Sequence, residues 1–214
     1  MFEYVLFDLD GTLIDSESGI VNSVLYAFEK YNITVNEKDE LRKFIGPAIQ
    51  ESFSTDYGFN EEEVPEVIAT FREYYSEKGV YEGKVFEGIV DVLKELKKRG
   101  KKLAVATSKP EVFTLRVLEH FGLAQYFDYV AAASLDETKT KKLVLIGEVV
   151  EHFDVDDLDK VVMVGDRKQD IRGAADSGVT SIAVKWGYGS DEEIAKHQPD
   201  YVAEKVEDLL ELIK

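Results

Sequence analysis

The chain has 214 residues, and its 44% hydrophobic content is typical of a globular protein with a buried core. Its 43 acidic and 26 basic residues give a formal net charge of −17, which argues against nucleic-acid polymers and membranes as partners. The absence of cysteine excludes disulfides, thiolate metal sites and cysteine nucleophiles, and without a basic, apolar leader or a bilayer-length apolar run we expect a cytoplasmic protein.

A short apolar run, Tyr4–Phe7, predicts a buried strand that stops near Leu9 and carries Asp8 and Asp10 into a tight turn at Gly11. Residues two apart on a strand point to one side, so we expect the two carboxylates to converge. Neighbouring carboxylates repel each other unless a cation lies between them, and Mg²⁺ is the simplest candidate. A plain polar loop is the alternative, whereas a calcium loop would need ligands that the following residues lack.

Helical periodicity replaces the strand pattern after Asp15. Apolar residues recur at helical spacing from Ile20 to Tyr31, and further helices are expected at 39–44 and after Asn60. These helices either pack on a sheet or form a separate cap, and we favour the cap. The predicted division is an α/β core domain, residues 1–14 and 84–214, with a helical cap domain inserted at residues 15–83.

Two local signals lie within this helical part. Gly46-Pro47 breaks the helical pattern, and we expect the segment Phe44–Ala48 to face the active site because small side chains and backbone are presented there. Asn60 with Glu63 resembles a capping box at the start of the last cap helix.

A second buried strand is predicted at Leu103–Ala106. Thr107 and Ser108 lie where this strand gives way to a turn, and Pro110 is expected to open the next helix, where its missing N–H costs nothing. A hydroxyl at a strand end, beside the backbone donors of a helix start, can form a phosphate cradle. An ordinary helix cap at Ser108 is the simpler alternative, and both can hold at once.

A basic island follows the third predicted strand, Phe127–Ala133. Lys139, Lys141 and Lys142 stand within four positions of an otherwise acidic chain. Such runs are usually solvated surface. Their position between a strand and the apolar run Leu143–Val150 favours a functional role for one of them.

A fourth buried strand, Lys160–Val164, runs into Gly165-Asp166, with Asp170 four residues further on. A helix start that attracts acidic residues explains one of these aspartates. It does not explain why a strand followed by acidic residues occurs here as well as at Asp8. We therefore expect these carboxylates to meet.

Strands that alternate with helices predict an α/β fold with a Rossmann-like parallel sheet and the first strand central. Asp8, Thr107, Lys142 and Asp166 all follow strand ends, the edge of a parallel sheet where ligands bind. The remaining expected features are helices at 88–100 and 206–213, strands at 181–185 and 201–202, a flexible aromatic loop at 186–189, a capping box of Ser190 and Glu193, and surface or packing roles for His120, His152 and His197.

Four stretches together resemble the haloacid dehalogenase-like phosphatases, and the resemblance covers essentially the whole chain. They are FDLDGTLIDS, TSKPEVF, SLDETKTKK and VGDRKQDIRGA, in the order in which that family has its motifs. With WGYGSDEE, they look most like the phosphoglycolate-phosphatase and 5′-nucleotidase-like subgroup, which has a helical cap.

The resemblance implies a role for each motif residue. Asp8 would attack phosphorus and form an aspartyl phosphate, while Asp10 would protonate the leaving oxygen and then activate water. Lys142 would steady the nucleophile, with Lys141 as the alternative. The implied phosphate contacts are Gly11, Thr107, Ser108, Lys109 and Lys142, with Thr107 and Lys142 also catalytic. The implied Mg²⁺ ligands are Asp8, the carbonyl of Asp10, Asp166 and Asp170.

The implied activity is Mg²⁺-dependent hydrolysis of a small phosphomonoester, with phosphoglycolate or a nucleoside 5′-monophosphate favoured. The expected partner is a small phosphorylated metabolite, and the expected state is a monomer or homodimer. A phosphosugar mutase of the β-phosphoglucomutase type would share Asp8 and Asp10. A dehalogenase would have no need of Asp10, and a phosphorylatable binding switch would store the acyl phosphate instead of turning it over.

Overall fold

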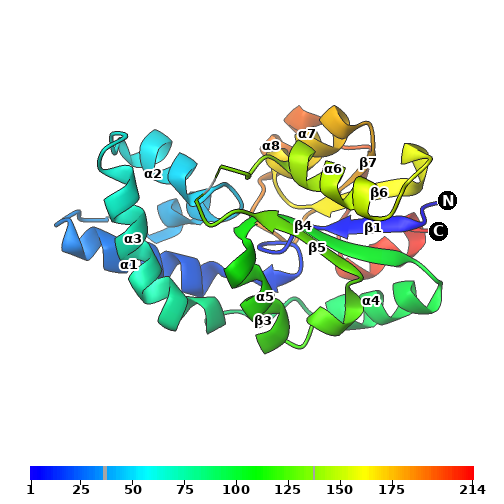
Figure 1. Ribbon diagram of the computed structural model, residues 1–214, viewed down its shortest axis with the longest axis horizontal. Helices are drawn as coiled ribbons and strands as arrows, with labels where there is room; N and C mark the ends of the chain where they lie inside the picture. Colours follow the sequence, from blue (N-terminus) through cyan, green and yellow to red (C-terminus); the bar gives the residue numbers. More distant parts are fainter. Residues whose placement is uncertain (36–37, 137) are drawn as a thin grey trace.

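A computed structural model of the chain describes residues 1–35, 38–136 and 138–214. Its centre is a six-stranded sheet in the order β5-β4-β1-β6-β7-β8, in which every neighbouring pair is parallel (Figure 1). The predicted α/β class and the interior place of the first strand are confirmed. The strands are β1 Tyr4–Phe7, β4 Lys102–Pro110, β5 Tyr129–Ala133, β6 Val161–Gly165, β7 Thr180–Val184 and β8 Tyr201–Ala203.

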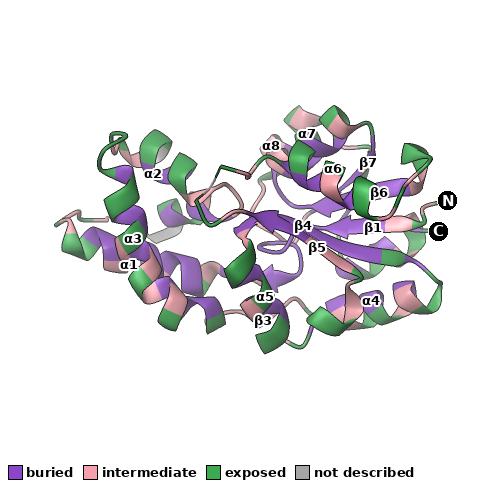
Figure 2. Cartoon of the chain, viewed as in Figure 1, coloured by how far each residue is buried: buried purple, intermediate pink, exposed green. Residues whose placement is uncertain are grey.

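Helices cover both faces of this sheet, and Figure 2 shows the strands between them as buried. Side chains alternate along β1, so Val5 and Phe7 pack with the helices of one face while Leu6 packs with those of the other. The first face carries α4 Ile89–Lys98, α5 Glu111–His120 and α9 Leu209–Leu212. The second carries α6 Lys142–His152 and α7 Lys168–Ser177, and α8 Asp191–His197 packs beside α7.

A group of helices lies at one end of the sheet (Figure 1). Phe28, Phe44, Phe53 and Tyr57 pack against one another at its centre, mostly edge to face, with ring centroids 4.6–6.1 Å apart. The buried phenylalanines of this aromatic cluster belong to the same continuous hydrophobic core as Val5 and Phe7 of β1. The elements are α1 Glu17–Lys30, the 3₁₀ helix η1 Lys38–Phe44, α2 Ile49–Tyr57, α3 Val64–Glu77 and the 3₁₀ helix η2 Gly79–Tyr81.

The chain enters and leaves this helical group through one short antiparallel pair. Strand β2, Ile14–Asp15, is hydrogen-bonded to β3, Lys84–Val85, with Asp15 opposite Lys84. The boundaries that the sequence predicts lie within β2 (14/15) and directly before β3 (83/84), and the division into core and cap domains stays a prediction.

Several local predictions need correction. Strand β4 does not stop at Ala106 but continues, with an irregular register after Thr107, to Pro110, which caps α5 instead of lying inside it. The paired strand β5 extends β4 in this way because it supplies hydrogen-bond partners as far as Ala133. The predicted C-terminal helix is split into a 3₁₀ turn, Val206–Asp208, and α9.

The two predicted capping boxes have different outcomes. Asn60 and Glu63 form the reciprocal hydrogen bonds, but they close a turn and α3 itself begins at Val64. Ser190 accepts from the Glu193 amide as expected, whereas the Glu193 carboxylate turns away to Arg167. The second box is therefore only half formed.

Two of the three histidines have the packing roles expected of them, since His120 lies against Tyr81 and His152 stacks on Tyr129 with centroids 3.9 Å apart. His197, for which no ring contact is found in the described chain, is the last residue of α8. Across residues 1–35, 38–136 and 138–214, no helix is both long and apolar enough to cross a membrane.

Candidate active site

Asp8 follows β1 directly, and its amide continues the sheet by donating to the Val164 carbonyl at 2.9 Å. It lies on the side that Leu6 occupies, toward α6 and α7. There the Lys142 Nζ, at the start of α6, is 2.7 Å from Asp8 Oδ1 and 2.7 Å from Asp170 Oδ1. It also donates to the Ala106 carbonyl at 2.7 Å. Lys142 is only 4% exposed, so this ion-pair triad is closed to bulk water.

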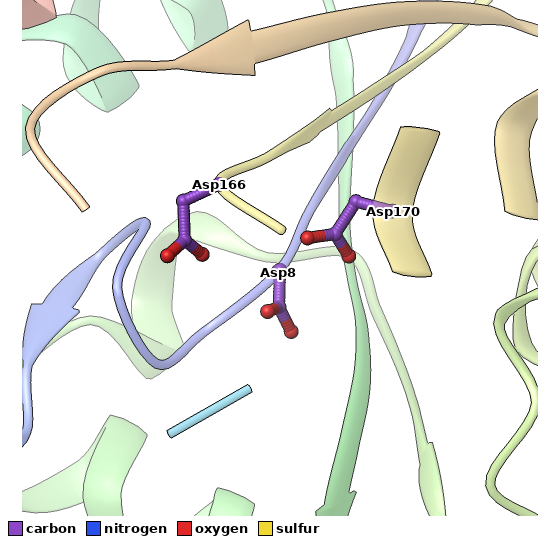
Figure 3. Close-up of side chains that lie close together, drawn as sticks. All are labelled: Asp8, Asp166 and Asp170. Carbon is purple, nitrogen blue, oxygen red and sulfur yellow. The ribbon is translucent and has the colours of Figure 1, made fainter. Parts of the chain in front are cut away.

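Asp166 completes a group of three buried carboxylates, shown in Figure 3. One oxygen from each of Asp8, Asp166 and Asp170 lies within 4.8 Å of the others. Asp166 is held in place by Thr12 Oγ1 at 3.2 Å and by the Tyr188 amide at 2.8 Å, while Asp170 Oδ2 accepts from the Arg167 amide at 3.0 Å. The structure thus brings together three of the predicted site aspartates from β1, β6 and α7.

The electrostatics of this group fit a divalent cation. Burial raises the pKa of Asp8 to about 6, with Lys142 lowering it and Asp170 raising it further. Burial and the charges of Asp170 and Asp8 raise the pKa of Asp166 to about 8. Burial lowers the pKa of Lys142, but Asp170 and Asp8 more than offset this and raise it. When all three carboxylates are ionised, the Lys142 ammonium balances one of their negative charges and two remain. Those two match the charge of a hard, oxygen-binding ion such as Mg²⁺.

Two glycines allow the backbone to close tightly around Asp166. Gly11 has φ +83°, and a Cβ there would lie 2.3 Å from Asp166 Oδ2. A Cβ on Gly187 would lie 2.4 Å from the Asp166 Cβ. Any side chain at either position would therefore displace this carboxylate. Gly11 acts in this way on Asp166, in addition to the phosphate contact predicted for it.

The carboxylate of Asp10 has a different partner. Its Oδ2 accepts from Lys109 Nζ at 2.6 Å, and this ammonium lies 4.9 Å from the centre of the Tyr75 ring on α3. Asp10 Oδ1 is buried and has no hydrogen-bond partner among the described residues. Among the described residues Asp10 is not part of the group that Asp8 forms with Asp166 and Asp170, but its charge is close enough to raise the pKa of Asp8. The approach of the Asp10 carbonyl to a metal stays a prediction.

A small cavity lies above Asp10, between the sheet and the helical group. Its volume is about 60 Å³, below the roughly 300–1000 Å³ typical of small-molecule sites. Lys109 and Ser108 form its floor, and Phe44, Gly46 and Pro47 of the predicted active-site segment line it from the helical side. Further walls come from Ile20, Ile49, Phe71, Arg72, Tyr75, Pro110 and Phe113.

The two predicted hydroxyls of the phosphate cradle have protein partners. Ser108 Oγ donates to the Thr140 carbonyl at 3.0 Å, and Thr107 Oγ1 accepts from the Lys109 amide at 3.3 Å. Thr107 is 2% exposed, at the end of the regular part of β4 beside β1. Lys141, the alternative to Lys142, is exposed, whereas Lys142 reaches Asp8, so the geometry favours Lys142.

The sequence patterns did not predict a contact between the loop that follows β6 and the helical group. The Arg167 guanidinium donates a hydrogen bond to the carbonyl of Ile45. It also pairs with Glu193, whose Oε1 lies 3.0 Å from Arg167 Nε. Gly46 follows with φ +103°, and a Cβ there would lie 2.7 Å from the Arg167 Cγ. The Gly-Pro break was the available signal, but nothing local identifies the arginine as its partner.

The loop at 186–189, predicted to be flexible, is instead fixed by hydrogen bonds. Trp186 Nε1 donates to the Thr12 carbonyl at 3.1 Å. Tyr188 anchors Asp166 through its amide and donates its hydroxyl to Asp15 Oδ1 at 2.6 Å. This loop therefore links Asp166, one of the three buried carboxylates, to Asp15 in strand β2.

Comparisons with known proteins agree with this geometry. A family model described as haloacid dehalogenase-like hydrolase matches residues 5–184. The chain is 39% identical over 197 residues to a 5′-nucleotidase of Pseudomonas aeruginosa, covering 92% of this chain and 89% of that protein. It is 38% identical over 194 residues to tyrosine-protein kinase PtkA of Mycobacterium tuberculosis, covering 91% of this chain and 66% of the kinase. A solved structure described as a predicted phosphatase, from Clostridium acetobutylicum, shares 42% identity with a TM-score of 0.96 and covers 100% of this chain and 98% of that one.

Proposed function

The chain belongs to the haloacid dehalogenase-like hydrolase family and is a phosphoric monoester hydrolase, and we propose that it acts with Mg²⁺ through an aspartyl phosphate on Asp8. One observation carries the proposal. Asp8 is paired with Lys142 at 2.7 Å and belongs to a buried group of three carboxylates. Asp10, two residues further along the chain, is paired with a different lysine, Lys109.

In the first step an Asp8 carboxylate oxygen attacks phosphorus, and the bond from phosphorus to the leaving oxygen breaks. Lys142 supports this step because its ammonium orients the carboxylate and faces the phosphoryl oxygens that carry negative charge. Asp10, in its protonated form, gives its proton to the leaving oxygen. The products of this half-reaction are the free alcohol and the aspartyl phosphate.

In the second step Asp10, now a carboxylate, takes a proton from water as the water oxygen attacks phosphorus. The acyl-phosphate bond breaks, inorganic phosphate leaves, and Asp8 returns as a carboxylate. Asp8, Asp166 and Asp170, with the Asp10 carbonyl, are the residues that would hold Mg²⁺, and the bound ion supplies positive charge that offsets the phosphoryl oxygens.

Two features support a small phosphomonoester as substrate. The cavity above Asp10 is narrow and largely apolar, with Lys109 near its floor. The relative from Pseudomonas aeruginosa is named a 5′-nucleotidase, which favours a nucleoside 5′-monophosphate, and phosphoglycolate is the smaller candidate. A nucleotide needs the helical group to move outward, because a cavity of about 60 Å³ does not hold a nucleoside.

Transfer of the phosphoryl group to an acceptor other than water is the second candidate. The relative named tyrosine-protein kinase favours it, and a phosphosugar mutase or a phosphorylatable switch would use the same Asp8 intermediate. Phosphate release separates these activities, since hydrolysis yields inorganic phosphate, a mutase an isomeric sugar phosphate and a switch a persistent acyl phosphate.

The test is Mg²⁺-dependent phosphate release from an aryl phosphate by the wild type and by Asp8→Asn. We expect the variant to lose roughly four orders of magnitude or more, because no nucleophile remains. Equal release by both proteins would refute the proposal. A panel of nucleoside 5′-monophosphates, phosphoglycolate and sugar phosphates, assayed for free phosphate and for isomeric products, then identifies the substrate class.

A further inference from the structure

A groove of about 420 Å³ lies between α2 and the starts of α6 and α7, which Figure 1 shows on opposite sides of the gap between the helical group and the sheet. Its volume is within the roughly 300–1000 Å³ range of small-molecule sites. It shares Ser108 with the cavity above Asp10, and Lys142, whose ammonium contacts Asp8, forms part of its wall. The groove therefore lies next to residues of the proposed catalytic centre.

Three cationic side chains, Lys141, Lys168 and Arg172, line this hollow, which we call the basic groove. None of the three is ion-paired with any residue in the described part of the chain. Lys141 and Arg172 are exposed and Lys168 is half-buried. The acidic residues of the lining are Glu51 and Asp176. The chain as a whole has a net charge of −17, whereas the lining of the groove holds more basic than acidic side chains.

Backbone dipoles add to the positive charge of the basic groove. Gln169 also lines the groove, but both amide atoms of its side chain are buried, without a hydrogen-bond partner among the described residues, and do not face the hollow. The N-terminal ends of α6 and α7, at Lys142 and Lys168, add positive potential through the helix dipole.

We propose that the basic groove captures phosphate-bearing anions and guides them to Asp8, an inference that rests on the proposed phosphatase function. A phosphomonoester dianion is repelled by the strongly acidic surface as a whole. A cationic hollow beside the catalytic centre raises the local concentration of such anions and lowers the KM for them. Inorganic phosphate, the product, is attracted by the same charges.

The test removes two charges of the basic groove and compares the result with a matched control. Lys168→Gln with Arg172→Gln changes two residues four apart on α7. Lys94→Gln with Lys98→Gln removes the same charge at the same spacing from α4, on the other face of the sheet, where the side chains are 59% and 81% exposed. All four residues lie outside the proposed catalytic machinery.

We expect the groove variant to raise the KM for an aryl phosphate and the inhibition constant of inorganic phosphate by roughly three- to tenfold at low salt, with kcat unchanged. The control should change neither constant by more than about twofold. The difference should disappear near 0.5 M NaCl, because screening then acts over only a few ångströms. Equal constants for groove variant and control would overturn the proposal, as would a loss of kcat alone.

Direct binding separates a failure of this inference from a failure of the proposed function. Inorganic phosphate is titrated calorimetrically into Asp8→Asn, alone and combined with each pair of substitutions. Weaker binding only in the groove combination supports the basic groove even if the wild type proves unable to hydrolyse phosphomonoesters. Equal binding in all three proteins refutes it, whatever the activity of the wild type.

Discussion

The two aspartates that follow β1 belong to regions with opposite charge balance. On the metal side, Asp8, Asp166 and Asp170 share one ammonium, that of Lys142. On the cavity side, Lys109, 2.6 Å away and beneath the ring of Tyr75, is the partner of Asp10 among the residues that the structure describes. Once its carboxylates ionise, the metal side keeps two uncompensated negative charges, whereas the cavity side is neutral.

This difference assigns distinct chemistry to residues that look alike in sequence. A net double negative charge in a buried place favours a divalent cation, and a bound cation would keep Asp8 ionised for the role of nucleophile proposed for it. A neutral ion pair beside the cavity leaves no charge for a metal to balance, which suits the acid–base role proposed for Asp10. Four predictions test this contrast, in order of decreasing effect.

Asp10→Asn should lower kcat by roughly 10²- to 10⁴-fold, because the amide can neither donate the leaving-group proton nor accept one from water. The loss should be larger for alkyl phosphates than for aryl phosphates with acidic leaving groups, which need less protonation. Steady-state assays on both substrate types measure it. Equal losses on both would show that Asp10 does not act as the acid.

Lys142→Met should destabilise the protein by about 3–5 kcal/mol, because two buried carboxylates lose their only ammonium. Lys109→Met leaves one such carboxylate and should cost less. Urea unfolding with and without Mg²⁺ measures both. Mg²⁺ should restore part of the loss in Lys142→Met and none in Lys109→Met; equal rescue would show that the two regions do not differ in the way proposed.

Without metal, stability should fall as the pH rises from about 4 to about 8. The pKa values of Asp8 and Asp166 in the folded chain, about 6 and about 8, lie above the ordinary value of 3.8, so folding favours the protonated forms and that advantage disappears as they ionise. Because Mg²⁺ binds the ionised forms, its effect on Tm should be larger at pH 8 than at pH 5.5. Thermal scans with Mg²⁺ and with a chelator test this, and a pH-independent Mg²⁺ effect would contradict it.

Tyr75→Phe should have the smallest effect, within about threefold on kcat. The ring of Tyr75 faces the Lys109 ammonium and is kept by phenylalanine, and such ring contacts contribute about 0.5–2 kcal/mol. Tyr75→Leu, which removes the ring, should raise the KM for substrate more than Tyr75→Phe does. The affinity for Mg²⁺ should stay unchanged in both variants. A change in Mg²⁺ affinity would mean that the cavity side and the metal side are coupled.

Much of the fold was predictable because its signals are local. An apolar run that ends in Asp8 and another that ends in Gly165-Asp166 identify buried parallel strands and place both acids at the same edge of the sheet. The alternation along β1 also accounts for why Asp8 meets α6 and α7. The exact ends of β4 were not predictable, since they depend on hydrogen bonds to β5.

The partners of the site residues could not be predicted in the same way. Glu193 was interpreted as half of a local capping box, but in the fold an arginine 26 positions away takes its carboxylate. Tyr75 is one of the buried residues of α3, yet nothing in the sequence of that helix identifies Lys109 as its neighbour. Such pairs arise from tertiary packing, which overrides local preference.

The β2–β3 pair has a consequence for modularity. Asp15 and Lys84 stand opposite each other in register, with an ion pair of 3.4 Å between their side chains. A replacement for everything between them would therefore have to begin and end at adjacent points to leave β2 and β3 in place. It would also have to rebuild the contacts that tie the helical group to the sheet, such as those of Ile45 with Arg167 and of Tyr75 with Lys109.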